Sequence, residues 1–206
     1  MEKYVLDTNL FFNMEPGLGM GKKTEEVVVA VTQAMKRLKK EERHEFFAPP
    51  KVIDEFLSFF EDKEQPFIKD FLSTITVKSP DLHSVSLSAA LVGQMIDEVR
   101  SRNYRGQTIA EEEIKQAAQT LAGIPNLGKK EFEMKIGPIV KHFRLRYRQA
   151  TRFGFIDSLA DFELIALAKE LNGFLVSSDE GVIRWARLFG VKEISAPLFG
   201  KKMIGS

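Results

Sequence analysis

The chain has 206 residues, enough for one well-packed core or for a core with a small added element. Cysteine is absent, which excludes disulfides and thiolate-bound zinc, and with three histidines a metal site would have to use a hard cation on oxygen ligands. No apolar run approaches the ~20 residues that span a bilayer and no signal-peptide pattern opens the chain, so we expect a cytoplasmic protein without membrane association. The net charge of +1 argues neither for nor against nucleic acid, whereas the distribution of the charges does.

The first third of the chain alternates between strand and helix patterns. Residues 4–6 form a short apolar run that is typical of a buried parallel strand, and the run stops at Asp7. Apolar residues then recur at helical spacing over residues 24–38. Residues 46–48 predict a second strand, which two prolines close before another helix begins. The loose alternation over residues 71–77 predicts a third strand.

Residues 79–154 have a helical pattern instead. A helix is predicted to begin near Ser84 and to end in a basic turn at residues 100–106. A second helical stretch covers residues 109–121, and a long final segment runs over residues 129–153. This block therefore predicts an inserted helical hairpin, in which a helix of twenty residues would reach about 30 Å.

Strand and helix patterns return in the last part of the chain. Apolar residues predict a helix that opens near Ile156 and stops at residues 172–173, followed by a buried strand over residues 174–177. Another helix over residues 182–189 and a last strand over residues 191–196 complete the pattern.

The fold class predicted from these patterns is α/β. Residues 1–78 and 155–206 are expected to form one domain around a central, mostly parallel sheet, because strands and helices alternate in both segments. Residues 79–154 are expected to form an inserted helical domain.

Acidic residues stand where open α/β sheets hold their ligands, at the carboxyl ends of strands and at the starts of the following helices. Asp7 follows the first strand, and Asp179 follows the strand over residues 174–177. Asp157 and Asp161 are four residues apart at a helix start, so they share one face of that helix. Two like charges at this spacing repel each other, and a bound divalent cation would remove that penalty.

A fifth carboxylate, Glu55, lies in an early turn of the second helix, where it could point at the same crevice. Four or five carboxylates with few other ligands are the chemistry of Mg²⁺ or Mn²⁺. Each acid also has a purely structural explanation. Asp7 could turn the chain or cap a helix, Asp157 and Asp179 could cap helices, Asp161 could be a solvated surface residue, and Glu55 could interact with the helix dipole. Taken singly these explanations are the better ones, but the shared context of the acids favours a metal site.

A run without any acidic residue, between Ile139 and Arg152, indicates contact with phosphates. Its five basic residues are Lys141, Arg144, Arg146, Arg148 and Arg152, with aromatic residues interleaved. A second basic cluster contains Arg100, Arg102 and Arg105, with Tyr104 among them. A solvated helix face often has the same composition, and for the second cluster the two explanations are balanced.

Four motifs, in this order along the chain, resemble the acidic signature of PIN-type metallonucleases. They are Asp7-Thr8-Asn9, the stretch from Val52 to Phe56 that contains Glu55, Asp157-x-x-x-Asp161, and Ser178-Asp179. The runs at residues 144–148, 154–161 and 176–181 further resemble the HARP family of minimal, RNA-free ribonuclease P proteins, and this similarity extends over essentially the whole chain. Archaeal relatives of this type have been labelled RNA ligase partner proteins.

The resemblance implies a PIN-like three-layer fold and endonucleolytic removal of the 5′ leader from precursor tRNA, with no RNA subunit. It also implies a homo-oligomer built from dimers, in which the inserted helices grip the tRNA elbow. The implied catalytic residues are Asp7, Asp157, Asp161 and Asp179. The implied ligands of Mg²⁺ or Mn²⁺ are the same four residues with Glu55, although Asp54 competes for that position, and Asn9 and Ser178 match polar neighbours that orient the site.

Two alternatives remain open at this point. Another PIN-type RNA endonuclease, such as a toxin-like one, would share the acidic residues and differ in its substrate; toxin-type members are usually shorter and lack a middle insertion of this length. A non-catalytic RNA-binding partner of an RNA ligase would cleave no RNA in the presence of magnesium.

Overall fold

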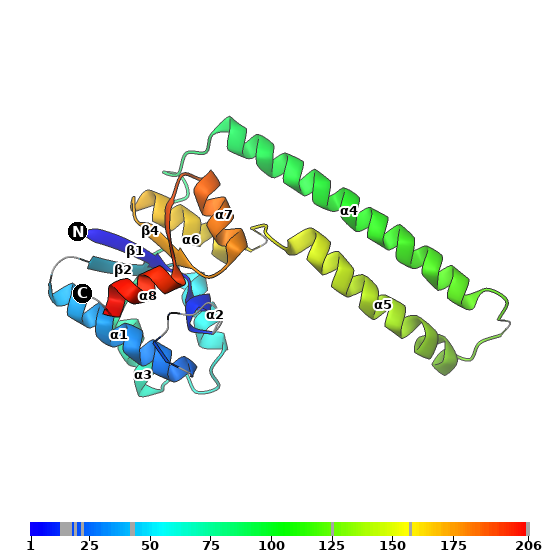
Figure 1. Cartoon of the computed structure of the whole chain (residues 1–206), viewed down its shortest axis with the longest axis horizontal. Helices are drawn as coiled ribbons and strands as arrows, with labels where there is room; N and C mark the ends of the chain where they lie inside the picture. The colour runs from blue at the N-terminus through cyan, green and yellow to red at the C-terminus, as the bar shows by residue number, and fades with distance from the viewer. Residues whose placement is uncertain are drawn as a thin grey trace. The chain divides into compact units, whose positions relative to one another are not determined.

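The centre of the fold is a five-stranded sheet in which every pair of neighbouring strands is parallel (Figure 1). Its strands are β1 (Glu2–Leu6), β2 (His44–Ala48), β3 (Thr76–Val77), β4 (Phe174–Ser177) and β5 (Lys192–Ser195), in the spatial order β3-β2-β1-β4-β5. The computed structural model describes residues 1–12, 18, 20–21, 23–41, 44–124, 126–156 and 158–204. An α/β fold with a parallel sheet is the class that the sequence predicts.

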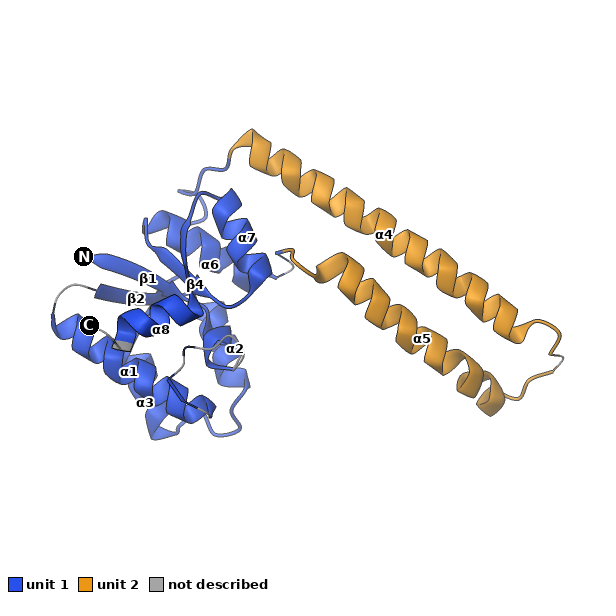
Figure 2. Cartoon of the chain, viewed as in Figure 1, with its two compact units in different colours: residues 1–87, 156–206 blue, residues 88–155 orange. Residues whose placement is uncertain are grey.

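The chain divides into two compact units, which Figure 2 shows in different colours. Unit 1 contains Met1–Leu87 and Ile156–Ser206, and unit 2 contains Ser88–Phe155. The helices of unit 1 are the 3-10 helix η1 (Thr8–Phe11), α1 (Thr24–Lys40), α2 (Pro50–Ser58), α3 (Pro66–Thr74), α6 (Leu159–Glu170), α7 (Glu180–Leu188) and α8 (Ala196–Ile204). Unit 2 is a pair of long helices, α4 (Ala89–Leu121) and α5 (Lys129–Arg152). Within the described ranges, none of these helices has the length and apolar character needed to cross a membrane.

Both faces of the sheet are buried, because successive side chains of a strand point to opposite faces. Tyr4 and Leu6 belong to a core cluster with residues of α1, α3 and α8. Val5 between them is also buried, and β1 contacts α6. Five consecutive residues of α6, from Leu164 to Ala168, are buried, so this helix is enclosed almost all round. The result is a three-layer arrangement of helices, sheet and helices.

The predicted strand over residues 71–77 is wrong for most of its length. Residues up to Thr74 belong to α3, and only Thr76 and Val77 form a strand. Ile68, Phe71 and Thr74 are the buried residues of α3, three apart, which is the spacing of a helix and not of a strand. Pro66 at the first turn also suits a helix start.

The predicted basic turn at residues 100–106 is also wrong, because α4 runs through it as one helix of 33 residues, about 50 Å long. The helix begins at Ala89, later than the predicted Ser84, and the Ser88 side chain caps it by accepting a hydrogen bond from the N–H of Leu91 (3.2 Å). The glycine that suggested a turn, Gly106, is buried on the face towards α5.

A last helix, α8, was not predicted. It is short and contains Gly200, which lowers its helical propensity. Gly200 is required by packing, because a Cβ atom there would lie 2.2 Å from the carbonyl oxygen of Leu18. This close approach is a tertiary contact that no local pattern reveals.

Candidate active site

The candidate active site lies where the chain connections reverse direction in the sheet. The strands β2 and β3 lie on one side of β1, and β4 and β5 lie on the other, so β1 and β4 flank the switch point of the topology. Ligands of open α/β sheets bind outside the carboxyl ends of the strands at this point. Leu6 pairs with Val176 there, and the backbone N–H of Asp7 donates to the carbonyl of Val176 (2.9 Å).

Asp7 is a buried carboxylate that is held at both oxygens. The hydroxyl of Ser177, the last residue of β4, donates to Oδ2 (2.6 Å). The backbone N–H of Asn9 donates to Oδ1 (3.0 Å), which makes Asp7 the cap of η1. The side chain of Asp7 is fixed by these bonds in a residue that is only 3% exposed.

Burial raises the pKa of Asp7 to about 6, in spite of the hydrogen bonds from Ser177 and Asn9, which lower it. The negative charges of Asp161 and Asp179 raise this pKa further. The structure therefore brings three of the predicted acids into one electrostatic neighbourhood, although Asp7 and Asp179 are far apart in the sequence.

Asp179 is fixed by the helix that follows it. Its Oδ1 accepts hydrogen bonds from the N–H groups of Gly181 (2.6 Å) and Val182 (3.0 Å). Asp179 therefore caps α7, as the structural explanation of this residue predicts. Its own N–H donates to the Ser177 hydroxyl (3.0 Å), and that hydroxyl donates to Asp7. Ser177 therefore links Asp7 and Asp179.

Asp161 lies in the first turn of α6 and is half-buried. Its backbone N–H donates to the hydroxyl of Ser158 (3.0 Å), the residue that caps this helix. Asp157, which was expected on the same helix face, lies outside the described residues. Glu55 and its neighbour Asp54 are both exposed on α2, a helix that contacts α6, and the assignment of Glu55 as a metal ligand stays a prediction.

The contribution of Ser177 was missed by the sequence analysis, which selected the next residue, Ser178, as the polar neighbour. Ser177 is 1% exposed and touches both acids, whereas Ser178 is half-buried. A signal was present, since Ser177 is a hydroxyl residue at the end of an otherwise apolar buried strand, where an unpaired hydroxyl would be costly.

The donor chemistry of this site fits a hard divalent cation. A buried carboxylate whose pKa is raised by burial and by two further carboxylates gains most from a positive charge placed beside it. Among the described residues, which do not include Asp157, no three His, Asp or Glu side chains lie close enough together to hold a metal ion. The assignment of Asp157 as a further ligand stays a prediction.

In unit 2, Arg102 joins the two long helices and does not fit the prediction that it binds RNA. It is 6% exposed, and its Nη1 donates to the carbonyls of Thr151 (3.1 Å) and Phe153 (3.0 Å). Its Nε donates to Glu98 (3.1 Å), and the guanidinium lies 4.8 Å from the ring centroid of Phe155. A side chain that is enclosed in this way cannot reach a phosphate.

Arg105 and Arg146 also hold the hairpin together, although they remain more accessible. The Nε of Arg105 donates to the carbonyl of Ala150 (3.2 Å). Arg146 donates to Glu113 (2.9 Å) and to Glu112 (2.6 Å), and Glu113 is buried. The acid-free run on α5 does not reveal these two acids, because they lie on α4.

The remaining predicted RNA contacts are exposed side chains of α5. They are Lys141, Arg144, Arg148 and Arg152. The acid-free run of the sequence thus corresponds to exposed basic residues on α5. Their contact with RNA stays a prediction.

Comparison with known proteins identifies the family of the chain. Residues 3–205 match the family described as PINc domain ribonuclease. The chain is 33% identical over 202 residues to a protein of Pyrococcus abyssi named RNA-free ribonuclease P, with 95% of this chain and 88% of that protein covered. Proteins of the same name in Thermodesulfovibrio yellowstonii (33% over 192 residues, 93% and 88% covered) and Hyperthermus butylicus (34% over 203 residues, 95% and 84% covered) are similarly related.

Proposed function

This chain belongs to the PINc domain ribonucleases, in the group of RNA-free ribonuclease P proteins, and from that premise we propose that it removes the 5′ leader of precursor tRNA without an RNA subunit. The observation that supports the proposal most strongly is the buried Asp7 between β1 and β4, with the charges of Asp161 and Asp179 acting on it. A buried carboxylate at a sheet's switch point, with the charges of two further acids acting on it, is costly to a protein that has no use for it.

The site would hold Mg²⁺ or Mn²⁺ through Asp7, Asp157, Asp161 and Asp179, with Glu55 as a further candidate. Such an ion, when bound, supplies positive charge for the phosphodiester oxygens and activates water. The protein itself positions the ligands: Ser177 orients the Asp7 carboxylate, and the first turn of α7 holds Asp179. Burial around Asp7 keeps bulk water from weakening these interactions.

The inserted helices α4 and α5, which were expected within residues 79–154, would act as a separate RNA-binding domain that grips the tRNA elbow. Exposed basic side chains suit this role because double-stranded RNA is recognised mainly through its shape, phosphates and 2′-hydroxyls. The exposed basic side chains of α5 that we assign to this role are Lys141, Arg144, Arg148 and Arg152. A homo-oligomer built from dimers and a cytoplasmic location complete the proposal.

The decisive experiment is incubation of the purified protein with a 5′-extended precursor tRNA and Mg²⁺, followed by mapping of the new 5′ end. We expect a cut at the mature terminus. Replacement Asp7→Asn should lower the single-turnover rate by at least ~100-fold while circular dichroism stays unchanged, because the variant keeps the shape of the side chain and loses its charge. Asp62→Asn, a matched change at an exposed loop carboxylate, should cut at the normal rate.

The same experiment separates the alternatives. Cleavage at other positions would mean that the chain is a more general RNA endonuclease and not a ribonuclease P. If no RNA is cut in Mg²⁺ or Mn²⁺, the chain is a non-catalytic RNA-binding protein and the proposal fails.

A further inference from the structure

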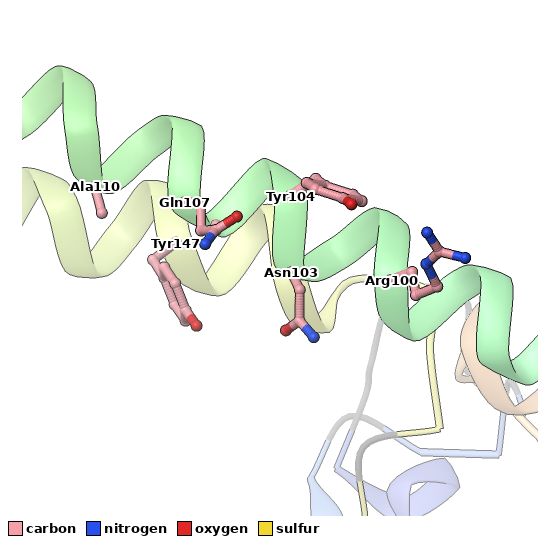
Figure 3. A pocket seen from close by; sticks show the side chains of 7 residues that line it. Arg100, Asn103, Tyr104, Gln107, Ala110 and Tyr147 are labelled. Carbon is pink, nitrogen blue, oxygen red and sulfur yellow. The ribbon is translucent and has the colours of Figure 1, made fainter.

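A groove of about 580 Å³ lies on the helical unit, between α4 and α5 (Figure 3). Its lining includes Arg100, Asn103, Tyr104, Gly106 and Gln107 from α4 and Tyr147 from α5. The volume is in the range of sites that take small molecules. None of the described residues that line it is acidic, although three glutamates, residues 111–113, follow the lining directly on α4. The groove thus suits a ligand with a planar, polar and electron-rich surface.

The ring of Tyr147 is held firmly on one side and open on another. A Cβ atom at Gly106 would lie 2.8 Å from the Tyr147 Cε2 atom, so the ring packs directly on the backbone of α4. The ring of Phe143 lies against it as well, with centroids 5.4 Å apart. Even so, Tyr147 is 41% exposed. Glycine is unfavourable inside a long helix, and here its lack of a side chain leaves the space in which the tyrosine ring packs.

The polar side chains of the groove are those that recognise the edge of a nucleobase. Asn103 and Gln107 are one helical turn apart, and each carboxamide offers both donors and an acceptor. Figure 3 shows Asn103 and Tyr147 pointing to the same side of the helix pair, with Gln107 beside the tyrosine. Arg100 adds a positive charge, and Arg144 and Arg148 flank Tyr147 on α5 as exposed side chains.

We propose that this groove binds one unpaired nucleobase of the RNA, stacked on the ring of Tyr147. Asn103 and Gln107 would hydrogen-bond to the edge of the base, and Arg100 would pair with a neighbouring phosphate. The inference rests on the proposed function for the identity of the ligand as RNA. Stacking of splayed-out bases on aromatic rings, with amide side chains at their edges, is how proteins distinguish single-stranded positions from the duplex.

The test measures binding and stacking without cleavage, in full-length protein carrying Asp7→Asn. The probe is an RNA hairpin with a single bulged 2-aminopurine, whose fluorescence is quenched by stacking, and the same hairpin with an abasic site at that position. We expect quenching on binding, and roughly 5- to 100-fold weaker binding of the abasic hairpin. This comparison leaves the groove intact and so does not depend on the folding of any groove variant.

Variants of the groove locate the effect. Tyr147→Leu and Gly106→Ala, which displaces the ring, should both abolish quenching, whereas Tyr147→Phe should retain it. Phe132→Leu is the matched control, since Phe132 is an aromatic residue of α5 that is also 41% exposed and lies outside the groove. Circular dichroism at 222 nm reports whether each helical hairpin is intact.

Equal affinity for the two hairpins, or undiminished quenching in a folded Tyr147→Leu variant, would overturn the inference. The outcome is independent of the cleavage assay. A protein that stacks the base and cuts no precursor tRNA would contradict the proposed function alone, and a protein that cuts at the mature terminus without stacking would contradict the groove alone.

Discussion

The Asp7 carboxylate is charged at neutral pH although the protein encloses it almost completely. Two hydrogen bonds, from Ser177 and from the backbone of Asn9, support the charged form, but the loss of water and the charges of Asp161 and Asp179 outweigh them. Burial of the ionised Asp7 carboxylate therefore lowers the free energy of unfolding. The protonated form of Asp7 does not have this effect.

This effect predicts a pH dependence of stability in EDTA. The pKa of Asp7 is about 6 in the folded protein and 3.8 in the reference state, so the folded protein binds more protons between these pH values. Its free energy of unfolding should fall as pH rises from about 4 to 6, by at most about 3 kcal/mol, and this contribution should stay constant above pH 6. Asp7→Asn lacks this slope, so urea unfolding at pH 7.5 should find the variant more stable than the wild type. Parallel curves for the two proteins from pH 4 to 8 would contradict the argument.

Addition of Mg²⁺ should reverse the order of the two proteins. A cation that binds only the folded state stabilises it by about 2.7 kcal/mol at a hundred times its dissociation constant. Wild-type protein at pH 7.5 should therefore show a rise in Tm with MgCl₂ that Asp7→Asn does not show. CaCl₂ at equal ionic strength tests whether a larger divalent cation has the same effect. NaCl at equal ionic strength tests whether ionic screening alone raises the Tm. An equal rise in both proteins would mean that Asp7 is not a ligand.

At the scale of secondary-structure elements, the two helices of unit 2 are joined by polar contacts as much as by apolar ones. α4 and α5 bury few large apolar side chains, with Ile109 and Ile139 among them. Arg102 joins α4 to the last turn of α5, and Arg146 joins α5 to Glu112 and Glu113. Arginine suits this role because its guanidinium group can donate hydrogen bonds to several acceptors at once.

Removal of Arg102 should loosen the hairpin at one end. Arg102→Met keeps most of the side-chain volume but removes the guanidinium that donates to two backbone carbonyls and to Glu98, which should cost about 2–4 kcal/mol of local stability. Hydrogen exchange of the C-terminal turns of α5 should be correspondingly faster. Arg100→Met, an exposed neighbour on the same helix, should leave these exchange rates unchanged. Equal rates in both variants would show that Arg102 does not hold the helices together.

The sequence predicts elements well where a local pattern decides them. The apolar runs of β1 and β4 and the acids that follow them, Asp7 and Asp179, are visible in the sequence because strand ends and carboxylates are both local features. The continuity of α4 is not visible, because Arg102 and Gly106 look like a basic turn until the partner helix is known. The hydroxyl of Ser177 at the end of an apolar strand is a local signal, but its acceptor Asp7 is 170 positions away and is not visible locally.

At the scale of the whole molecule, RNA binding should depend steeply on salt. Each neutralised phosphate contributes about 0.7–0.9 to the slope of log K against log salt. Arg144→Ala and Arg148→Ala, at exposed positions of α5, should each reduce the slope for precursor tRNA by about one. Lys63→Ala, at an exposed loop of unit 1, should leave it unchanged. An affinity that is flat between 50 and 300 mM KCl would exclude the basic surface as a phosphate contact.

The hydrogen bond between Ser177 and Asp7 has a consequence for biosynthesis. The two residues are made 170 positions apart, and at ribosomal speeds of ~5–20 residues per second the nascent chain exists for on the order of ten seconds or more before the second one emerges. During that time β1 lacks its neighbour β4, and Asp7 lacks both the hydroxyl that orients it and the acid at the start of α7. A still-growing polypeptide therefore lacks the arrangement on which the proposed activity rests, and under that proposal only a chain completed beyond α7 would cut RNA.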